Sequence, residues 1–461
     1  PNASMAVAYG HLRVLKCERA RGVQRVIDEF FHSLAELHGS DVVGVILSGA
    51  GSDGANGIAA IKEHGGITLA QDPHSAQFPS MPASAIATAC IDFVLTPEQI
   101  ADELSLIARH LAIRSGSTAA MAGDGDARKI LAMLRSRTGV DFRSYRRATV
   151  QRRILRRMLT HRSASQEEYL EHLRTHPEDL DALYEDLLIG VTRFFRDPET
   201  FATLRTSAFP EIMKGRAADA PIRVWVAGCS SGEEAYSIAI ALLEFVEGTE
   251  AATTPIHVFA TDLSEPAITR ARAGLYPDSI ESVVSPDRLA RFFVRETGGY
   301  RVSRDVRDLC VFATQNIIHD PPFSQLDLIS CRNVLIYFEP ALQERVIPMF
   351  AYALKPTGLL LLGAAESVGS STESFTPFDK AHRIFRPVSD RHLTGADRVA
   401  GMFPLVRAGP ANARPAHSPT ADAVRHDADR AVLARFGPPG VVINERPEVT
   451  QQLGVRRLAD E

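Results

Sequence analysis

The stretch VWVAGCSSGEEAYSIAIALLEF, residues 224–245, decides the fold of the C-terminal half of the chain. An apolar run ends at Gly228, a glycine-containing turn follows, and an apolar helix begins at Glu233 and Glu234. Strand, glycine turn and helix in this order open many nucleotide-binding sheets. A phosphate at the start of the helix would need backbone N–H groups and no negative charge. The two carboxylates therefore predict a ligand other than ATP or NAD.

A sulfonium ligand accounts for these two acids. S-adenosylmethionine has no phosphate and carries a cationic sulfur and an ammonium group, and both charges are favourable beside carboxylates. The glycines of the turn let the backbone pass close to a ligand. The next predicted strand ends at Asp262. An acid at this position can accept hydrogen bonds from both ribose hydroxyls of a bound nucleoside. Each acid alone fits a simple helix cap, but the ordered set predicts S-adenosylmethionine as cofactor.

The alternation of strands and helices over residues 222–387 favours a mostly parallel sheet with helices on both faces, so the fold class is α/β. Helical periodicity without strand signals precedes this region, and a further strand–helix pattern stands at the start of the chain. We expect six segments: an α/β domain (1–112), a small-residue linker (113–127), a small all-α domain (128–200), the Rossmann-like sheet domain (201–388), a second linker (389–430) and the first strands of another domain (431–461).

Composition limits the class of protein. A hydrophobic fraction of 45% and a net charge of −5 over 461 residues indicate a globular protein and argue against bulk nucleic-acid binding. Five cysteines without a C-x-x-C pair fit reduced thiols in the cytosol better than disulfides or a zinc site, so we expect a cytoplasmic protein without a metal. No apolar run reaches the length of a membrane span. The first residue is not Met, so the chain is expected to be part of a longer protein.

GAGSDG at 49–54 formally satisfies the dinucleotide-binding pattern G-x-G-x-x-G between a strand and a helix. Asp53 lies inside this loop, where it would repel a pyrophosphate. A plain glycine turn that packs a helix on a strand is an alternative.

The stretch GVILSGAGSDGANGIAAIKEHGGITLAQDPHSAQFPSMPASAI, 44–86, resembles the C-terminal part of the chemotaxis receptor methylesterase (CheB-type) domain. The resemblance implies that Asp53 is the aspartate of a Ser-His-Asp triad. That family places its serine and histidine well upstream of this loop, so we expect a truncated domain without methylesterase activity in this chain.

The stretch RSYRRATVQRRILRRM, 143–158, is strongly basic and contains no acid. Its apolar residues Val150, Ile154 and Met158 recur every four positions and are expected to pack inward. A solvated helix face is one interpretation of the arginines. The other is a patch for an acidic partner, either nucleic acid or a glutamate-rich protein helix. Arg146, Arg153 and Arg157 fall on a helix stripe next to the apolar residues, and Arg152 and Arg156 lie close to it. These five arginines would form the patch.

Residues 128–387 resemble the chemotaxis receptor glutamate methyltransferase (CheR) family throughout. The resemblance rests on four motifs in the order of that family: VTRFFRDPETF, AGCSSGEEAYSIAI, FATDLSEPAITRARAGLY and LISCRNVLIYF. It implies transfer of a methyl group from S-adenosylmethionine to glutamates of a chemoreceptor, with the basic helix meeting the acidic receptor helices. It implies no nucleic acid and no membrane insertion. Further signalling domains would lie in a longer chain.

The resemblance also implies roles for individual residues. Thr192 and Arg196 would contact the methionine end of the cofactor, Asp262 would hold the ribose, and Tyr337 would lie near the transferred methyl group. Tyr337 and Arg196 are also expected to orient the reacting carboxylate or the cofactor in catalysis. The other positions implied to line the cofactor pocket are Gly228, Glu233, Glu234, Asn316, Ile317, Cys331 and Arg332. Gly190 stands where the family can have a cofactor-contacting asparagine.

Two other functions remain open on the sequence. HDPPF at 319–323 resembles the motif of amino-methyltransferases that act on nucleic acid, but it precedes the fourth strand of the sheet, whereas the motif follows that strand in those enzymes. A non-catalytic signalling scaffold with a degenerate cofactor pocket is the second alternative. The last stretch, GVVINERPEVTQQLG, resembles the opening of a PAS sensor domain.

Overall fold

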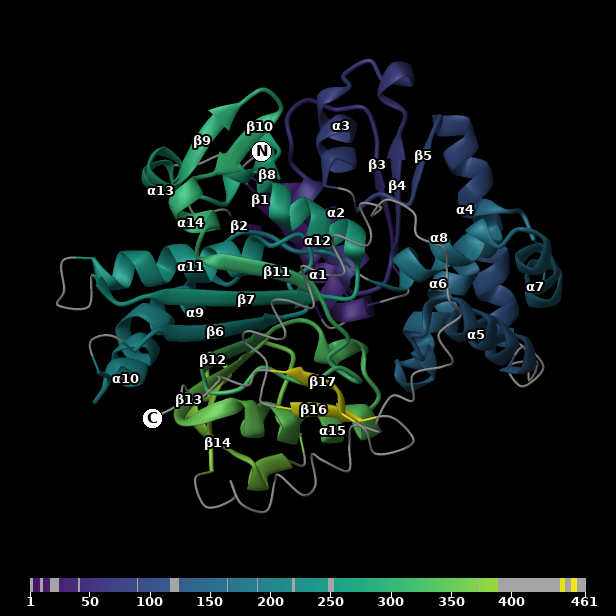
Figure 1. Cartoon of the computed structure of the whole chain (residues 1–461). Coiled ribbons are helices and arrows are strands. Elements are labelled where there is room, and N and C mark those ends of the chain that lie inside the picture. Colours follow the sequence, from purple (N-terminus) through teal and green to yellow (C-terminus); the bar gives the residue numbers. More distant parts are fainter. Residues whose placement is uncertain are drawn as a thin grey trace. The chain divides into compact units, whose positions relative to one another are not determined.

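The computed structural model, shown in Figure 1, divides into two compact units, residues 1–191 and 192–461. It describes residues 3–8, 11–16, 25–39, 42–88, 90–116, 124–163, 165–188, 190–217, 220–247, 253–369, 371–388, 440–443 and 449–453. Within these residues, no helix is both long and apolar enough to cross a membrane.

The first unit begins with an α/β segment. Its three-stranded parallel sheet has the order β3-β4-β5, and β1 and β2 form a separate antiparallel hairpin. The strands are β1 (Ala3–Ala8), β2 (His11–Lys16), β3 (Val43–Ile46), β4 (Ile67–Gln71) and β5 (Phe93–Leu95). The helices are α1 (Val26–His38), α2 (Ala55–Glu63), α3 (Ser80–Ala87) and α4 (Pro97–Gly116).

The α-helices described in the all-helical part of the first unit are α5 (Asp124–Thr138), α6 (Arg147–Thr160), α7 (Gln166–Thr175) and α8 (Glu178–Leu187). The apolar stripe of α6 is buried as expected at Val150, Ile154 and Met158. Leu155 and Leu159 of the same helix join a cluster with Ile67 and Leu69 of β4 and residues of α4. The basic helix therefore packs on the sheet of the α/β segment.

The second unit is built on a seven-stranded sheet of order β11-β7-β6-β12-β13-β15-β14. Its first five strands in this order are parallel, and β15 is antiparallel to both of its neighbours. The strands are β6 (Ile222–Ala227), β7 (Ile256–Asp262), β11 (Cys310–Thr314), β12 (Leu326–Cys331), β13 (Leu354–Leu362), β14 (Phe375–Asp379) and β15 (Ile384–Pro387). The strands that follow β6 are added first on one side of it, as β7 and β11, and then on the other side, as β12 and β13. The strand order therefore reverses between β6 and β12, and open α/β sheets bind ligands at such a point.

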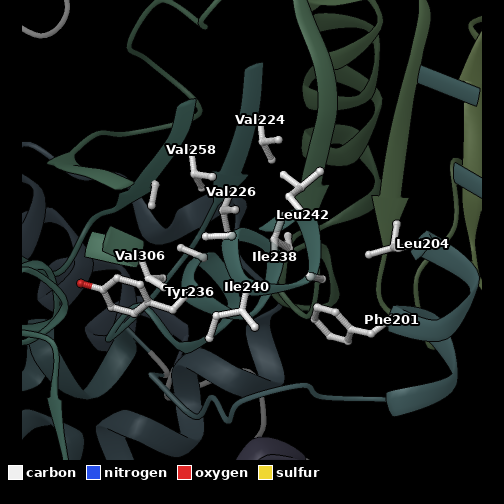
Figure 2. Packing of buried hydrophobic residues seen from close by; sticks show 14 of the residues in the cluster. Phe201, Leu204, Val224, Val226, Tyr236, Ile238, Ile240, Leu242, Val258 and Val306 are labelled. Atoms are coloured by element: carbon white, nitrogen blue, oxygen red, sulfur yellow. The ribbon is translucent and has the colours of Figure 1, made fainter. Parts of the chain in front are cut away.

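Helices cover this sheet on both faces. Figure 2 shows Val224, Val226 and Val258 of the strands packed with Ile238 and Leu242 of α11 on one face. On the other face, Trp225 packs edge-on against Phe350 of α15, with ring centroids 5.6 Å apart. The helices are α9 (Pro198–Thr203), α10 (Phe209–Met213), α11 (Glu233–Val246), α12 (Glu265–Ala273), α13 (Pro286–Phe292), α14 (Arg304–Arg307) and α15 (Pro340–Ala353). This confirms the predicted α/β architecture.

Several elements differ from the expectation. A small antiparallel sheet of order β8-β10-β9 was not predicted. Its strands are β8 (Leu275–Tyr276), β9 (Phe293–Glu296) and β10 (Gly299–Val302). Helices α4 and α5 enter the predicted linker 113–127 from both sides, and residues 192–200 belong to the sheet unit.

The predicted second linker, 389–430, lies outside the described residues. Beyond it, β16 (Gly440–Ile443) and β17 (Val449–Leu453) form an antiparallel pair. Their assignment to a PAS domain stays a prediction.

Candidate cofactor and active site

The glycine turn after β6 crosses the end of β7. The backbone N–H groups of Gly228 and Cys229 both donate to the carbonyl of Thr261, at 2.8 and 2.9 Å. Gly228 has a φ of +75°, and a Cβ atom there would lie 2.3 Å from Cγ2 of Val334. Both observations require glycine at this position, because the left-handed backbone and the close approach each disfavour a side chain.

Asp262 lies at the carboxyl end of β7, beside the turn. Its two carboxylate oxygens accept hydrogen bonds from the N–H groups of Ser230 (2.8 Å) and Ser264 (2.9 Å). Burial raises the pKa of this carboxyl group, and the backbone donors oppose that shift. A carboxylate has about four acceptor sites, so the group can accept from a ligand hydroxyl as well while the backbone donors fix its orientation.

Glu233 opens α11 directly after the turn. Its carboxylate accepts a hydrogen bond from the hydroxyl of Ser231 at 2.8 Å. Burial raises the pKa of Glu233 to about 7. Its charge at neutral pH therefore depends on what lies next to it, and a nearby cation would favour the ionised form.

A pH dependence of ligand binding follows from Glu233. The raised pKa means that this group gains its charge as the pH rises through about 7, so a cationic ligand beside it would bind more tightly at pH 8 than at pH 6. We expect titration calorimetry with S-adenosylhomocysteine, whose amino group is cationic, to show this increase together with proton release near pH 7. Glu233→Gln should remove the dependence. An unchanged pH profile in the variant would contradict this role.

Glu234 is held by an arginine. Its carboxylate accepts hydrogen bonds from Nη1 of Arg332 at 3.0 and 2.9 Å and from the hydroxyl of Ser330 at 3.0 Å. Glu234 and Arg332 are 9% and 8% exposed. Nη2 of Arg332 donates to the carbonyl of Arg196 at 3.0 Å and to the carboxylate of Asp197. Arg332 thus ties β12 to α11 and to the segment that precedes α9.

That segment, residues 192–197, carries two of the predicted cofactor contacts. Phe195 and Asp197 have positive φ values of 47° and 58°, and the N–H of Phe195 donates to the hydroxyl of Ser237 in α11 at 2.9 Å. The backbone is thereby fixed against α11, and Thr192 and Arg196 are half-buried. Asp197 and Ser330 were not predicted as site residues. Asp197 stands within the motif VTRFFRDPETF, and Ser330 follows from no pattern in the sequence.

The remaining predicted residues lie after β11 and β12. Asn316 opens a turn in which its N–H donates to the carboxylate of Asp320 at 2.7 Å, and Ile317 is 9% exposed. Asp320 therefore closes a turn before β12, and HDPPF precedes the fourth strand, as predicted. Cys331 is fully buried at the end of β12, and burial raises the pKa of its thiol well above the usual range. Tyr337 ends a short 3₁₀ helix and is half-buried.

These residues fit S-adenosylmethionine in their chemistry. The carboxyl ends of β6, β7 and β12 bring together a fixed carboxylate at Asp262, an acid of raised pKa at Glu233, and the paired Glu234 and Arg332. Hydroxyl groups suit the carboxylate of Asp262, and an ammonium group suits that of Glu233. Arg332 already compensates the charge of Glu234, and the contact of Glu234 with the cofactor stays a prediction.

Three models of known protein families match the chain. Residues 190–384 match the model of the CheR methyltransferase SAM-binding domain, residues 125–188 match the CheR all-alpha domain, and residues 1–104 match the CheB methylesterase. The chain is 34% identical to the putative methyltransferase Cher3 of Pseudomonas putida over 273 residues, which are 57% of this chain and 97% of the relative. It is 31% identical to the chemotaxis protein methyltransferase of Escherichia coli over 264 residues, 55% and 88% of the two chains.

A longer relative covers nearly the whole chain. An uncharacterised 104.1 kDa protein of Rhodobacter capsulatus is 35% identical over 479 residues, which are 98% of this chain and 50% of that protein. The chain thus spans about half the length of this relative. Among solved structures, the CheB methylesterase catalytic domain of Thermotoga maritima is 28% identical, with a TM-score of 0.21, over 22% of this chain and 56% of that one.

Fold and sequence together define the second unit as an α/β domain of the S-adenosylmethionine-binding methyltransferase class. The chain belongs to the CheR methyltransferase family, and a CheB methylesterase-like segment precedes its helical domain. The cofactor predicted from the acids is the one that this family's domain binds.

In the first unit, Asp53 caps a helix. Its carboxylate accepts hydrogen bonds from the N–H groups of Ile27 and Asp28 at the start of α1, both at 3.0 Å. Asp28 in turn accepts from the N–H groups of Gly54 (2.9 Å) and Gly57 (2.7 Å) at the start of α2. A carboxylate of the chain itself therefore occupies the position that a pyrophosphate would take, which contradicts the dinucleotide interpretation of GAGSDG. The triad role of Asp53 stays a prediction.

The arginines of α6 are largely engaged within the first unit, contrary to a free basic face. Arg156 binds the carboxylates of Asp92 (2.8 Å) and Asp186 (2.7 Å), and Arg157 binds Asp179 at 2.9 Å. Arg152 donates to the carbonyl of Gly65 at 3.0 Å, Arg153 is 4% exposed, and Arg146 is exposed. The physical reason is that the packing of α6 brings acids of the chain itself to its basic side.

One cluster in the first unit has the composition of a metal site. Ligand atoms of His161, His172 and Asp179 lie within 4.8 Å of one another. The guanidinium of Arg157 contacts both His161 (2.9 Å) and Asp179 (2.9 Å), and so places a positive charge among the three. The cluster is therefore a polar network around Arg157, and it was not predicted from the sequence.

Proposed function

We propose that this protein is an S-adenosylmethionine-dependent protein-glutamate O-methyltransferase that acts in the cytoplasm on the acidic helices of a chemoreceptor or similar sensory receptor. The observation that carries the proposal is the fixed Asp262 carboxylate beside the Gly228 turn, at the reversal point of a sheet that matches the CheR family. The match to chemotaxis methyltransferases supports the substrate class.

The chemistry requires positioning more than proton transfer. A glutamate side chain has a reference pKa near 4.3, so the receptor carboxylate is already a nucleophile at neutral pH. The cofactor, when bound, supplies an electrophilic methyl group on a sulfonium. The residues of this chain would hold the ribose (Asp262), bind the methionine end (Thr192 and Arg196), and exclude water around the attacking carboxylate. Tyr337 would orient that carboxylate.

A substitution at Tyr337 tests the positioning role. We expect Tyr337→Phe to lower kcat about 10-fold, because one hydrogen bond to the reacting carboxylate is worth about 1–2 kcal/mol. The pH profile of the rate should keep its shape, since the phenol transfers no proton. A new titration in the profile of the variant would show that Tyr337 acts as an acid or base.

The receptor surface is proposed to include Arg146, which is exposed. Three other arginines of α6 already have partners in the first unit: Arg152 contacts Gly65, Arg153 contacts Lys62, and Arg156 contacts Asp92. They would reach a receptor helix only if α6 separated from these partners. Arg146→Glu should therefore raise KM for receptor fragments more than Arg153→Gln does.

The proposal is tested by incubating the chain with radiolabelled S-adenosylmethionine and cytoplasmic fragments of candidate receptors. Carboxyl methyl esters release methanol in mild alkali, whereas methylated amines do not. Alkali-labile label on the receptor supports the proposal. Label stable to alkali would indicate an amino-methyltransferase, and no label with any receptor would favour a signalling scaffold. The scaffold is the second candidate because the exposed Gly190 stands where the family can have a cofactor-contacting asparagine.

A further inference from the structure

Glu366, in the loop after β13, is a buried carboxylate that the cofactor contacts described above do not include. It is 4% exposed and accepts hydrogen bonds from four backbone N–H groups. Oε2 accepts from Gly363 (2.7 Å) and Asn333 (2.9 Å), and Oε1 accepts from Val334 (2.9 Å) and Ile336 (3.2 Å). Three of these donors belong to one short segment, residues 332–337, that follows β12.

This segment needs an internal acceptor. Asn333 has a φ of +60°, and a 3₁₀ helix, Leu335–Tyr337, begins two residues later. Successive N–H groups therefore point to one side and lack the ladder partners that a continued strand would provide. A carboxylate is a strong acceptor for such a group of donors. Arg332 and Tyr337, at the two ends of the segment, are the side chains that the proposed reaction uses.

The packing around Glu366 is specific. A Cβ atom on Gly363 would lie 2.8 Å from Oε2 of Glu366 and 3.0 Å from the nitrogen of Asn333. The glycine thus lets the loop after β13 close onto the segment after β12. This contact is separate from the hydrogen bonds themselves and shows that the two loops are fitted to each other.

We propose that Glu366 is a positioning residue that fixes segment 332–337 for methyl transfer. Through this segment it sets Arg332 against Glu234 and Asp197, and it presents Tyr337 to the receptor carboxylate. The inference rests on the proposed methyltransferase function. It assigns to Glu366 no contact with cofactor or substrate.

Glu366→Gln is the sharpest test, because it keeps the shape of the side chain. The amide oxygen can still accept from one pair of N–H groups, but its NH₂ group faces the other pair, which are donors as well. We expect kcat to fall at least about 10-fold, since charge-assisted hydrogen bonds are lost and two buried donors are left without an acceptor. The Kd for S-adenosylhomocysteine should change less than about 3-fold, because Asp262 and Glu233 lie on other strands and helices. Amide hydrogen exchange should speed up at residues 333, 334 and 336.

Asp327→Asn is the matched control. Asp327 is a carboxylate of 2% exposure at the start of β12, at the opposite end of this strand from segment 332–337. It accepts from the N–H of Arg223 at 2.8 Å and pairs with Arg216 and Lys355. This substitution should lower stability and leave kcat of the folded protein unchanged. A purely structural role of Glu366 predicts the same pattern for Glu366→Gln, so kcat within twofold of the wild type in that variant would overturn the inference. A wild-type chain that transfers no methyl group would instead refute the proposed function, and the inference with it.

Discussion

Arg332→Met is expected to lower the free energy of unfolding of the sheet unit by about 3–5 kcal/mol. Both members of the pair that it breaks, Arg332 and Glu234, are buried. Without the guanidinium, the Glu234 carboxylate keeps the hydroxyl of Ser330 as its hydrogen-bond donor among the described residues. An uncompensated charge in a low-dielectric interior is the main cost. Asp197 and the carbonyl of Arg196 lose their partner as well.

The measurement is urea unfolding followed by tryptophan fluorescence. Trp225 is the one tryptophan of the chain and is fully buried in β6, so its emission reports on the sheet unit. Arg304→Met is the matched control, because Arg304 and its partner Asp308 are 83% and 65% exposed and such pairs contribute about 0–1 kcal/mol. The double variant Arg332→Met, Glu234→Met should recover most of the stability but none of the methyl transfer. A loss below about 1 kcal/mol in the single variant would contradict the buried-pair account.

Gly228→Ala is expected to cost about 2–5 kcal/mol and to reduce methyl transfer at the same time. An alanine at a φ of +75° costs about 1–2 kcal/mol. Its Cβ would also lie 2.3 Å from Val334, and forced repacking of this kind costs about 1–3 kcal/mol. Val334 belongs to segment 332–337, so its displacement moves Arg332 and Tyr337 together.

Two variants separate these effects. Gly215→Ala has a similar φ of +67° and nothing within 4 Å of the new Cβ, so it measures the backbone cost alone. Gly228→Ala, Val334→Ala removes the methyl groups that clash and should recover stability. Urea unfolding and the initial rate of methyl transfer measure both quantities. Equal losses of stability in Gly228→Ala and Gly215→Ala would mean that the close approach of Gly228 to Val334 adds nothing to the cost of the substitution.

The α/β class of the sheet domain and the identity of its ligand were predictable, because the signals are local. The glycine turn, the two acids of 224–245 and the acid at the end of the next strand follow one another in the sequence, and parallel strands bring them to one edge. The pairing of Glu234 with Arg332 was not predictable, because 98 residues separate the two and no periodicity links them. The same holds for Glu366, whose donors are backbone groups that have no signal in the sequence.

The basic helix shows a different limit. Its amphipathic pattern correctly predicted burial of Val150, Ile154 and Met158, but charge alone does not say which acids a positive face will meet. Asp92 and Asp186 lie far from α6 in sequence and bind Arg156 in the fold. The buried carboxylate of Asp92 is also paired with Lys62, and both cations lower the pKa of Asp92. A basic stretch that looks like a partner site can therefore be compensated within the chain.

Titration calorimetry with S-adenosylhomocysteine on the wild-type chain and on Asp262→Ala tests most directly whether the acids at the strand ends hold the cofactor. We predict binding at one site in the wild type and an affinity at least about 100-fold lower in the variant, since two hydrogen bonds to a carboxylate are worth about 3–6 kcal/mol together. The emission of Trp225 verifies that the variant is folded. Equal affinities in the two proteins, or no heat with the wild type at high micromolar ligand, would contradict the account.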